Sequence, residues 1–322
     1  MRIVLVLLTV AAILTPGAFG QETVLRAGII GLDTSHAIAF TDLLNNPKNK
    51  DHVPGIRVVA AFKGGSADLK DSIGRVDNFT RTIQEKYGVE IVETIEALVA
   101  KVDVVLLHSL DGRVHLDQVR PVFAAKKRVF IDKPLSASVK DAREIVRLSK
   151  ESGTPFFSGS ALRFNDAVVQ LKGNPEIGRI LGCTVHSSAY AVDHHPELAF
   201  YGIHGIEALF SLMGPGFDSL RRWDDVVVAR WKDGRTATYR PLKKGAQTFG
   251  ATVYGEKSIQ TTVRGEKTGS TYANLVREIV KFFQTGVSPV SPDEMVEVMA
   301  FIEAADVSRA RNGDVVRMED LK

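Results

Sequence analysis

The chain has 322 residues, enough for two domains of ordinary size. Its 44% hydrophobic and 25% charged residues are typical of a globular protein and exclude a mainly disordered or fibrous one. The 41 basic and 38 acidic residues leave a net charge of +3, without the basic excess of a nucleic-acid-binding protein, so no nucleic-acid partner is expected. The single cysteine, Cys183, excludes an internal disulfide and a zinc site built from several thiolates.

The first 20 residues have the pattern of a secretory signal peptide. Arg2 precedes an uncharged apolar run over residues 3–14, and Ala18-Phe19-Gly20 places small residues where a signal peptidase cleaves. The run is shorter than the roughly 20 apolar residues that span a bilayer, so no stable membrane anchor is expected. The alternatives are a buried N-terminal helix or a retained anchor. We expect export through the general secretory route, to the periplasm in a Gram-negative cell.

Strand and helix patterns alternate over the first half of the remaining chain. Ser138 and Gly153 are typical N-terminal and C-terminal helix signals, and they bound the clearest helix. The alternation predicts a doubly wound parallel sheet with helices on both faces, a Rossmann-type domain over residues 21–158. The predicted strands cover residues 24–30, 56–62, 90–92, 102–107, 129–131 and 156–158, and the predicted helices cover 35–45, 80–87, 94–100, 115–125 and 138–152.

The second half has a different pattern, with alternating strands joined by tight turns such as Asp233-Gly234. It predicts an α+β domain over residues 159–322 with an open, largely antiparallel sheet. The expected domain boundary lies near Gly159. The predicted strands cover residues 181–191, 226–231, 235–240, 247–254 and 258–263, and the two final helices cover 271–285 and 292–311.

A turn that could bind phosphate follows the first predicted strand directly. In a dinucleotide-binding fold this turn offers backbone N–H groups and a helix N-terminus to a pyrophosphate, with the pattern G-x-G-x-x-G. Here only Gly31 is kept, and Asp33 and His36 replace the other two glycines. A carboxylate is unfavourable beside a phosphate, so the alternative role of Asp33 is to cap the helix. We predict cofactor contacts from Gly31, Asp33, Thr34, Ser35 and His36.

The end of the second predicted strand is the next candidate. Enzymes that use NAD usually have an acidic residue here for the ribose 2′-hydroxyl. This chain has Lys63-Gly64-Gly65-Ser66 instead. Lys63 and Ser66 could hold a 2′-phosphate, which favours NADP slightly over NAD. The alternative is an ordinary glycine turn with a solvated lysine.

Polar residues also follow the next two predicted strands. His108 and Ser109 come after the most apolar strand, and Asp132-Lys133-Pro134 comes directly after residues 129–131. Ligands of doubly wound sheets lie beyond the carboxyl ends of the strands, so His108, Ser109, Asp132 and Lys133 are expected to reach the cofactor. A lysine at a strand end can also polarise a hydroxyl or carbonyl group.

His204 and Glu207 lie three residues apart, which places them on one face of a helix. The imidazole could accept a proton while the carboxylate orients it. The alternative is a partly buried histidine with a local hydrogen bond. Arg163 is a candidate for binding an anionic or polar substrate, with a structural salt bridge as its alternative. His194, His195 and Glu197 lie nearby, but their spacing matches no metal site, so no metal is predicted.

Taken in this order, the motifs resemble the Gfo/Idh/MocA oxidoreductases, the glucose–fructose oxidoreductase and inositol dehydrogenase family. The resemblance rests on the GIIG sequence at 28–31, on the run from residue 102 to Leu135, on Arg163-Phe164 and on the His204-x-x-Glu207 pair. The Lys133-Pro134 element is the most specific of these. The resemblance covers nearly all of residues 21–322 and implies a nucleotide-binding domain followed by an α/β domain with an open sheet.

The resemblance also implies roles for individual residues. Lys133 matches the family's catalytic lysine, and His204 matches its acid–base histidine. Glu207 stands where the family usually has aspartate, and Asp132 replaces the usual glutamate. His115 matches a histidine on the nicotinamide side of the site, so it too is expected to contact the cofactor.

The sequence therefore predicts an exported oxidoreductase that transfers a hydride between NAD(P) and a hydroxyl of a carbohydrate or polyol. Lys133, His204 and Glu207 would be catalytic, and Arg163 and His204 would bind the substrate. Phe200 stands where many family members have an aspartate, and the phosphate turn is altered. The alternative is a non-redox sugar-binding protein, or a lyase-like enzyme on the same fold. The open sheet of the family suggests a homo-oligomer.

Overall fold

The computed structural model describes residues 24–263 and 271–321. The predicted signal peptide lies outside these residues, and so do residues 264–270, which precede the last two helices. Among the helices that are described, none is long and apolar enough to cross a membrane.

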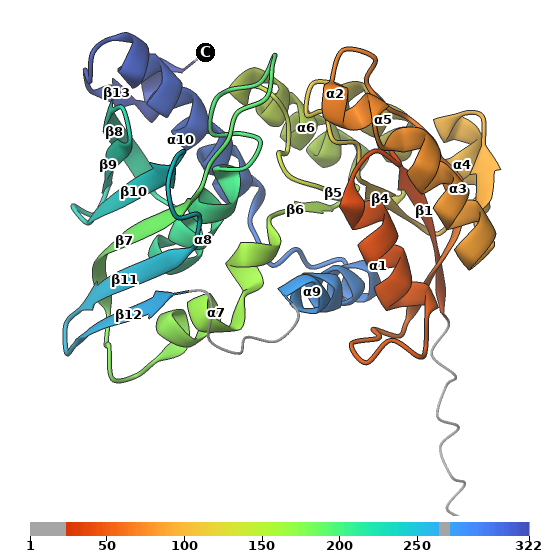
Figure 1. Cartoon of the computed structure of the whole chain (residues 1–322), viewed down its shortest axis with the longest axis horizontal. Helices are drawn as coiled ribbons and strands as arrows, with labels where there is room; N and C mark the ends of the chain where they lie inside the picture. Colours follow the sequence, from red (N-terminus) through yellow and green to blue (C-terminus); the bar gives the residue numbers. More distant parts are fainter. Residues whose placement is uncertain (1–23, 264–270, 322) are drawn as a thin grey trace, which may run out of the picture.

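The first half forms a six-stranded, entirely parallel sheet with the strand order β3-β2-β1-β4-β5-β6 (Figure 1). This order reverses at β1 and β4, so the loops after these two strands meet at the same edge of the sheet. The predicted parallel Rossmann-type sheet is confirmed. Its strands are β1 (Leu25–Ile30), β2 (Ile56–Phe62), β3 (Glu90–Val92), β4 (Val104–Leu107), β5 (Arg128–Ile131) and β6 (Phe156–Ser158).

Local capping explains several helix limits in this half. Thr34 accepts from the N–H of His36 at the start of α1, Ser138 accepts from Asp141 N–H, and Gly153 adopts the left-handed conformation after α6. The prediction missed α2 and began the next helix too late, at 80 rather than 76. The helices are α1 (Ser35–Asn45), α2 (Lys70–Ile73), α3 (Val76–Tyr87), α4 (Ile95–Lys101), α5 (His115–Ala124) and α6 (Val139–Ser152).

The second half forms a seven-stranded sheet with the order β12-β11-β7-β10-β9-β8-β13. It is antiparallel except for the pair β7 and β10, so the largely antiparallel prediction is confirmed. The prediction missed β8 and β13. The strands are β7 (Ile180–Ser188), β8 (Phe217–Trp223), β9 (Val226–Trp231), β10 (Thr236–Leu242), β11 (Gly250–Gly255), β12 (Ile259–Val263) and β13 (Val316–Arg317).

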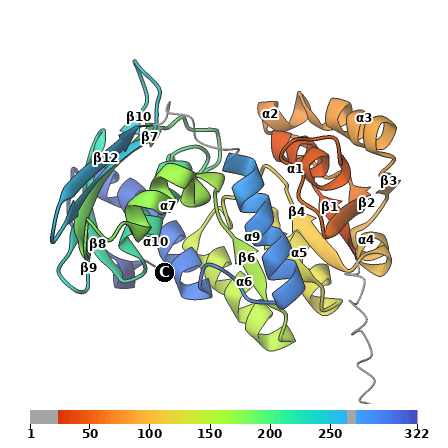
Figure 2. The same cartoon turned by 90° about the horizontal axis from the view of Figure 1, so that it is seen from below.

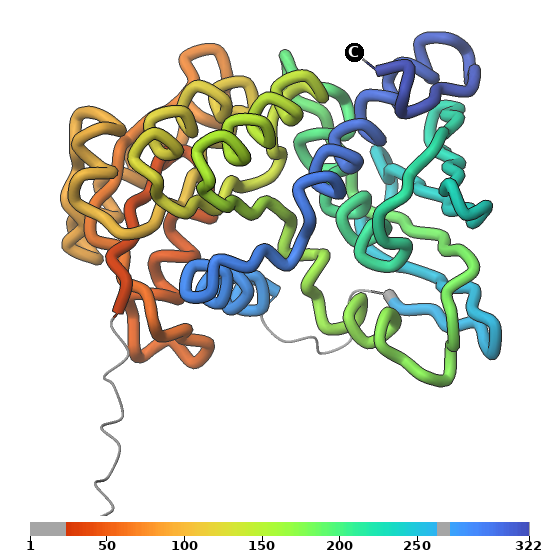
Figure 3. Tube along the Cα trace, turned by 180° about the vertical axis from the view of Figure 1, so that it is seen from behind, coloured from red at the N-terminus to blue at the C-terminus, as the bar shows by residue number. Residues whose placement is uncertain are grey.

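The helices of the second half join the two sheets. α8 packs on β7, and α9 packs against α1, β5 and η1, so it lies beside the first sheet although it comes late in the chain (Figure 2). The chain then passes to α10, which contacts both α6 and β8 (Figure 3). The domain limits at residue 159 remain a prediction. The helices are α7 (Asp166–Gly173), α8 (Ile203–Met213), α9 (Thr271–Thr285) and α10 (Pro292–Ala310), with 3₁₀ turns η1 (Ala161–Phe164) and η2 (Met318–Asp320).

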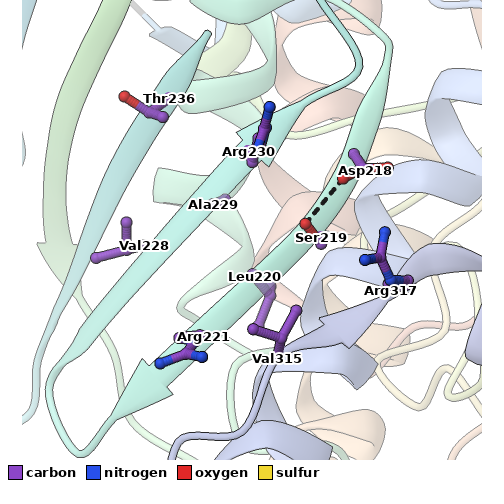
Figure 4. A pocket seen from close by; sticks show the side chains of 10 residues that line it. All are labelled: Asp218, Ser219, Leu220, Arg221, Val228, Ala229, Arg230, Thr236, Val315 and Arg317. Carbon is purple, nitrogen blue, oxygen red and sulfur yellow. Dashed lines mark hydrogen bonds between the residues drawn. The ribbon is translucent and has the colours of Figure 1, made fainter. Parts of the chain in front are cut away.

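The second sheet has an open depression of about 310 Å³ around β8, β9 and β13, lined by residues such as Val228, Arg230, Thr236 and Arg317 (Figure 4). Other apolar side chains of this sheet are also exposed, including Tyr254 and Ile259. A smaller depression of about 280 Å³ lies on the first half beside Arg57, Lys86 and Tyr87. The predicted catalytic residues line neither of them.

Candidate active site between the two sheets

The turn after β1 packs against the loop after β4. Gly31 has a φ of 90°, and a Cβ atom at this position would collide with the backbone nitrogen of Ser109, so only glycine fits. Thr34, rather than Asp33, is the N-cap of α1, and the first turn of α1 contains no acidic residue. Ser35, the first residue of the helix, is exposed. The partial positive charge at the N-terminus of α1 is therefore not neutralised by a carboxylate of the helix itself.

Asp33 replaces the second glycine of the phosphate turn, and its side chain is fully buried. Its carboxylate accepts hydrogen bonds from Leu110 N–H at 3.0 Å and from Ser72 Oγ at 2.8 Å. Burial raises the pKa of Asp33, and the two hydrogen bonds oppose that shift. Asp33 therefore ties the turn after β1 to α2 and to the loop after β4. The suggestion that Asp33 caps the helix is wrong.

The loop after β2 is tied to the same place. Ser66 Oγ donates to Asp111 Oδ2 at 2.8 Å, and Lys63 Nζ lies 2.6 Å from Asp77 Oδ1 in an exposed ion pair. Arg113 bonds both Asp111 and Asp68. The Ser66 hydroxyl and the Lys63 ammonium each have a carboxylate partner within the protein. The geometry gives no support to a preference for a 2′-phosphate at this position.

Asp132 lies between two histidines. Its Oδ2 atom is 2.7 Å from His36 Nδ1 and 2.8 Å from His108 Nδ1, and all three side chains are buried. Burial opposes ionisation of Asp132, but the charges and hydrogen bonds of the two histidines outweigh it and hold its pKa well below the usual value. Asp132 Oδ1 accepts the backbone N–H of Lys133 at 2.8 Å. This carboxylate thus fixes the strand end from which Lys133 projects.

His115 is also inside the protein. Its Nε2 atom lies 2.8 Å from Ser109 O and its Nδ1 atom 3.2 Å from Leu135 O, and burial lowers its pKa. The imidazole joins the loops after β4 and β5. The side chains of Asp33, His36, His108, His115 and Asp132 are therefore committed to bonds within the protein, instead of being open to a cofactor as the sequence suggested.

Lys133 lies where the two halves of the chain meet. Its Nζ atom donates to the carbonyl oxygen of Phe200 at 3.1 Å and lies 5.2 Å from the centre of the Phe200 ring. Burial lowers the pKa of Lys133, while Asp132 partly opposes that shift. Phe200 belongs to residues 189–202, the segment between β7 and α8, which we call the bridging segment. It runs along the top of the view between the two sheets (Figure 1).

The middle of the bridging segment contacts both halves of the molecule through two side chains, His195 and Glu197. His195 Nε2 lies 3.1 Å from Asp111 Oδ1 of the first half. Glu197 contacts Arg222, Lys243 and Arg309 of the second half. The segment therefore spans the two halves of the molecule. It places the backbone of Phe200 beside Lys133 at the end of β5.

His204, near the start of α8, lies four residues after Phe200. Its Nδ1 atom is 2.5 Å from Ser160 Oγ, and the Tyr201 ring packs edge-on against its imidazole, with ring centres 5.0 Å apart. Ser160 Oγ also accepts the N–H of Leu162, at 3.3 Å. In the neutral tautomer whose Nδ1–H donates a hydrogen bond to Ser160 Oγ, the ring has its lone pair on Nε2. The sequence analysis missed Ser160, because a lone serine after a strand carries no motif.

Glu207 does not orient His204. Its carboxylate is bonded to Arg163 Nε, and Arg163 Nη1 bonds Glu294 Oε1 at 2.6 Å. All three side chains are buried. Burial raises the pKa of Glu207 and Arg163 opposes that shift. Arg163 and Glu207 thus form a structural salt bridge, the alternative stated for Arg163, and Ser160 is a partner of His204. This geometry gives no support to the predicted catalytic role of Glu207 or to the predicted substrate contact of Arg163.

The described residues contain no candidate metal-binding cluster. Within residues 24–263 and 271–321, no group of three or more His, Cys, Asp or Glu side chains is arranged to hold an ion. His195 pairs with Asp111, and Glu197 pairs with three cations, so these neighbours of His204 serve the bridging segment.

A family model described as an oxidoreductase family with an NAD-binding Rossmann fold matches residues 25–160. This is the Gfo/Idh/MocA family model, and the match covers less than half of the chain. An uncharacterised oxidoreductase from Streptococcus pneumoniae is 25% identical over 149 residues, which is 41% of this chain and 40% of that protein. The chain therefore aligns with less than half the length of this curated relative.

Solved structures extend the likeness to both halves of the chain. A probable dehydrogenase from Thermotoga maritima has a TM-score of 0.73 and 20% identity, and the match covers 92% of this chain and 100% of that one. A myo-inositol 2-dehydrogenase from Lactobacillus plantarum has a TM-score of 0.73 and 17% identity, and the match covers 92% of this chain and 99% of that one. A scyllo-inositol dehydrogenase from Lactobacillus casei, solved with NAD(H) and scyllo-inositol, has a TM-score of 0.73 and 15% identity. The match covers 92% of this chain and 100% of that one. At these identities the likeness establishes the fold of both halves of the chain.

Proposed function

We propose that this protein is an oxidoreductase that transfers a hydride between a nicotinamide cofactor and a hydroxyl-bearing carbon of a carbohydrate or polyol. The observation that carries the proposal is the contact between Lys133 and Phe200. It puts a lysine from the carboxyl end of the first sheet next to the segment that leads into His204. The family of residues 25–160 and the inositol dehydrogenases among the similar structures support it.

The turn after β1 can accept a cofactor phosphate. The N-terminus of α1 has no acidic residue in its first turn, Ser35 is exposed there, and the Asp33 carboxylate is turned to Leu110 and Ser72. Gly31, Thr34 and Ser35 would hold the pyrophosphate through backbone N–H groups and hydroxyls. When bound, the nicotinamide supplies the hydride donor or acceptor. We assign no preference for NADP to Lys63 and Ser66.

Lys133 and His204 divide the proton chemistry between them. The Lys133 ammonium donates a hydrogen bond to the reacting oxygen and stabilises negative charge on it. His204 Nε2 accepts the hydroxyl proton as the C–O single bond becomes a carbonyl, and returns it in the reverse direction. Ser160 holds the imidazole in the required tautomer through Nδ1.

A second candidate is a sugar-binding or lyase-like protein that uses Lys133 and His204 without a nicotinamide. The network that joins Asp33 to Ser72 and Leu110, and Ser66 to Asp111, favours it. This network uses the side chains of the loops after β1, β2 and β4 to bind these loops to one another. Binding of a dinucleotide without a sugar separates the two candidates.

We further propose that the protein is exported to the periplasm, on the basis of the signal-like residues 1–20, and that it self-associates through the second sheet. The exposed Val228, Tyr254 and Ile259 support such an interface. Mass spectrometry of the protein from a periplasmic extract tests export, since a cleaved chain begins near residue 21. Light scattering of the purified protein tests self-association.

The activity is tested by following reduced nicotinamide while the protein is supplied with NAD or NADP and a panel of cyclitols, aldoses and sugar acids. Lys133→Ala should lower the turnover of the best substrate by at least about 100-fold. Its circular dichroism and unfolding midpoint should stay close to those of the wild type, since Lys133 is only half-buried. Turnover equal to wild type in this variant would overturn the proposed role.

A further inference from the structure

Two tyrosines stack at the edge of the candidate site. The rings of Tyr190 and Tyr201, which we call the tyrosine pair, have centres 4.5 Å apart and planes inclined by 27°. Both belong to the bridging segment. Tyr190 is 49% exposed although it stacks on Tyr201. About half of its side-chain surface is therefore open to the solvent.

The tyrosine pair is continuous with the catalytic residues. Tyr201 packs edge-on against His204, and the Tyr190 ring lies 5.6 Å from that of Phe200, whose carbonyl holds Lys133. The series His204, Tyr201, Tyr190 therefore leads outward from the candidate reaction centre. A ligand ring on Tyr190 would be separated from His204 by the Tyr201 ring.

A charged pair lies near the tyrosines on the other half of the molecule. Arg75 Nη2 and Asp71 Oδ1 are 3.0 Å apart, next to and within α2. The charges of both residues act on the Tyr190 hydroxyl, and that of Arg75 also acts on the Lys133 ammonium. Arg75 and Asp71 of the first half therefore lie near enough to Tyr190 for their charges to act on its hydroxyl.

We propose that the tyrosine pair is a second saccharide subsite, which stacks a sugar ring linked to the ring that reacts at Lys133 and His204. The C–H groups of a pyranose form an apolar face that packs on an aromatic ring, while its hydroxyls reach polar groups at the rim. Tyr190 supplies the aromatic face, and Arg75 and Asp71 supply the rim. The identity of the reacting ring rests on the proposed function. The substrate class is then a disaccharide or larger glycoside.

Binding without turnover tests this subsite. Tyrosine and tryptophan fluorescence of the full protein is titrated with methyl β-D-glucopyranoside as a one-ring probe, and with cellobiose and maltose as two-ring probes. We expect at least one two-ring probe to bind about tenfold more tightly than the one-ring probe, the amount that one stacked ring contributes. Tyr190→Ala should remove this advantage and leave the one-ring affinity within about twofold. Tyr190→Trp should retain it.

Tyr254→Ala is the matched control, because Tyr254 is similarly exposed on β11 of the second sheet. It should keep the two-ring preference. Equal affinity of one-ring and two-ring probes for the wild type, absence of two-ring binding in the folded protein, or an unchanged preference in Tyr190→Ala would each overturn the subsite. A preference that depends on Tyr190, in a protein that turns over no substrate with nicotinamide, would support the subsite and contradict only the proposed function.

Discussion

The Nδ1 atom of His36 lies 2.7 Å from Oδ2 of Asp132, a residue 96 positions later in the chain. His36 stands where a dinucleotide-binding turn usually has its third glycine, and Asp132 directly precedes the candidate catalytic lysine. The bond therefore couples the altered phosphate turn to the end of β5. Stacking of His36 on Phe40 and its edge-on contact with Tyr272 hold the imidazole in place. His36, which stands in place of that glycine, therefore helps to hold Asp132 and the adjacent Lys133 in position.

His36→Ala should destabilise the protein by about 1–3 kcal/mol, because a buried carboxylate loses one of its two histidine partners. Urea unfolding of the variant and the wild type measures the difference. His194→Ala is the matched control, since its side chain is 53% exposed, and it should change stability by less than about 0.5 kcal/mol. Equal effects of the two substitutions would contradict the support role of His36.

Sequence reasoning predicted the first sheet well because the apolar runs and cap residues are local signals. Thr34, Ser138 and Gly153 act at the helix ends as their types suggest. It missed β8, whose run Phe217–Trp223 carries two arginines, although Arg222 is buried. Arg222 is neutralised there by Glu197 and Asp306. Such a partner comes from the tertiary fold, which residue patterns along the chain do not reveal.

The pH profile of turnover should report on Lys133. The account uses the protonated ammonium, so kcat/KM should fall as the pH rises through the pKa of Lys133. Burial lowers that pKa from 10.5, so the decline should begin below the ordinary lysine range. Lys133→Arg should lower turnover. Its kcat/KM should not fall at high pH, because a guanidinium stays protonated there. Identical basic limbs in the two proteins would show that another group titrates.

Arg163→Leu should destabilise the protein by about 3–5 kcal/mol near neutral pH, because it leaves Glu207 and Glu294 as buried carboxylates without their cation. Burial raises the pKa of Glu207 in the folded state, so the folded protein holds this proton more tightly than the unfolded chain. Stability from this group is present at low pH and is lost as the pH rises through the raised pKa.

The loss caused by Arg163→Leu should therefore be smaller near pH 5 than near pH 7, as measured by urea unfolding at both values. Arg147→Leu provides the comparison, since Arg147 forms exposed ion pairs with Glu144 and Glu151 on α6. It should lower stability much less than Arg163→Leu does, because solvent screens exposed ion pairs. A similar small loss for Arg163→Leu would mean that its salt bridge is replaceable.

Ser160→Ala should lower kcat about tenfold with a smaller effect on KM, because His204 loses the partner that fixes its tautomer. The acidic limb of the pH profile should shift, which a purely structural role of Ser160 would not cause. Ser160→Thr keeps the hydroxyl and should restore the wild-type limb. Unchanged pH dependence in Ser160→Ala would remove Ser160 from the mechanism.

The candidate site was only partly predictable. Lys133 and His204 could be proposed because each belongs to a short motif, and the structure places Lys133 against Phe200, four residues before His204. The roles of Glu207 and Arg163 were misassigned because helical spacing gives the face of a residue and not its partner. Ser160 and Phe200 lie 44 and 67 residues from the side chains they contact, so nothing local indicates their roles.

Calorimetric titration of the purified protein with NAD, NADP and their reduced forms tests the central claim most directly. It asks whether the turn at Gly31, Thr34 and Ser35 still accepts a dinucleotide once Asp33 and His36 have replaced two glycines. The account predicts micromolar or tighter binding of at least one form, weakened about tenfold or more when Ser35 is replaced by glutamate. Absence of binding by all four forms, in protein shown to be folded, would contradict the oxidoreductase assignment and favour the non-redox alternative.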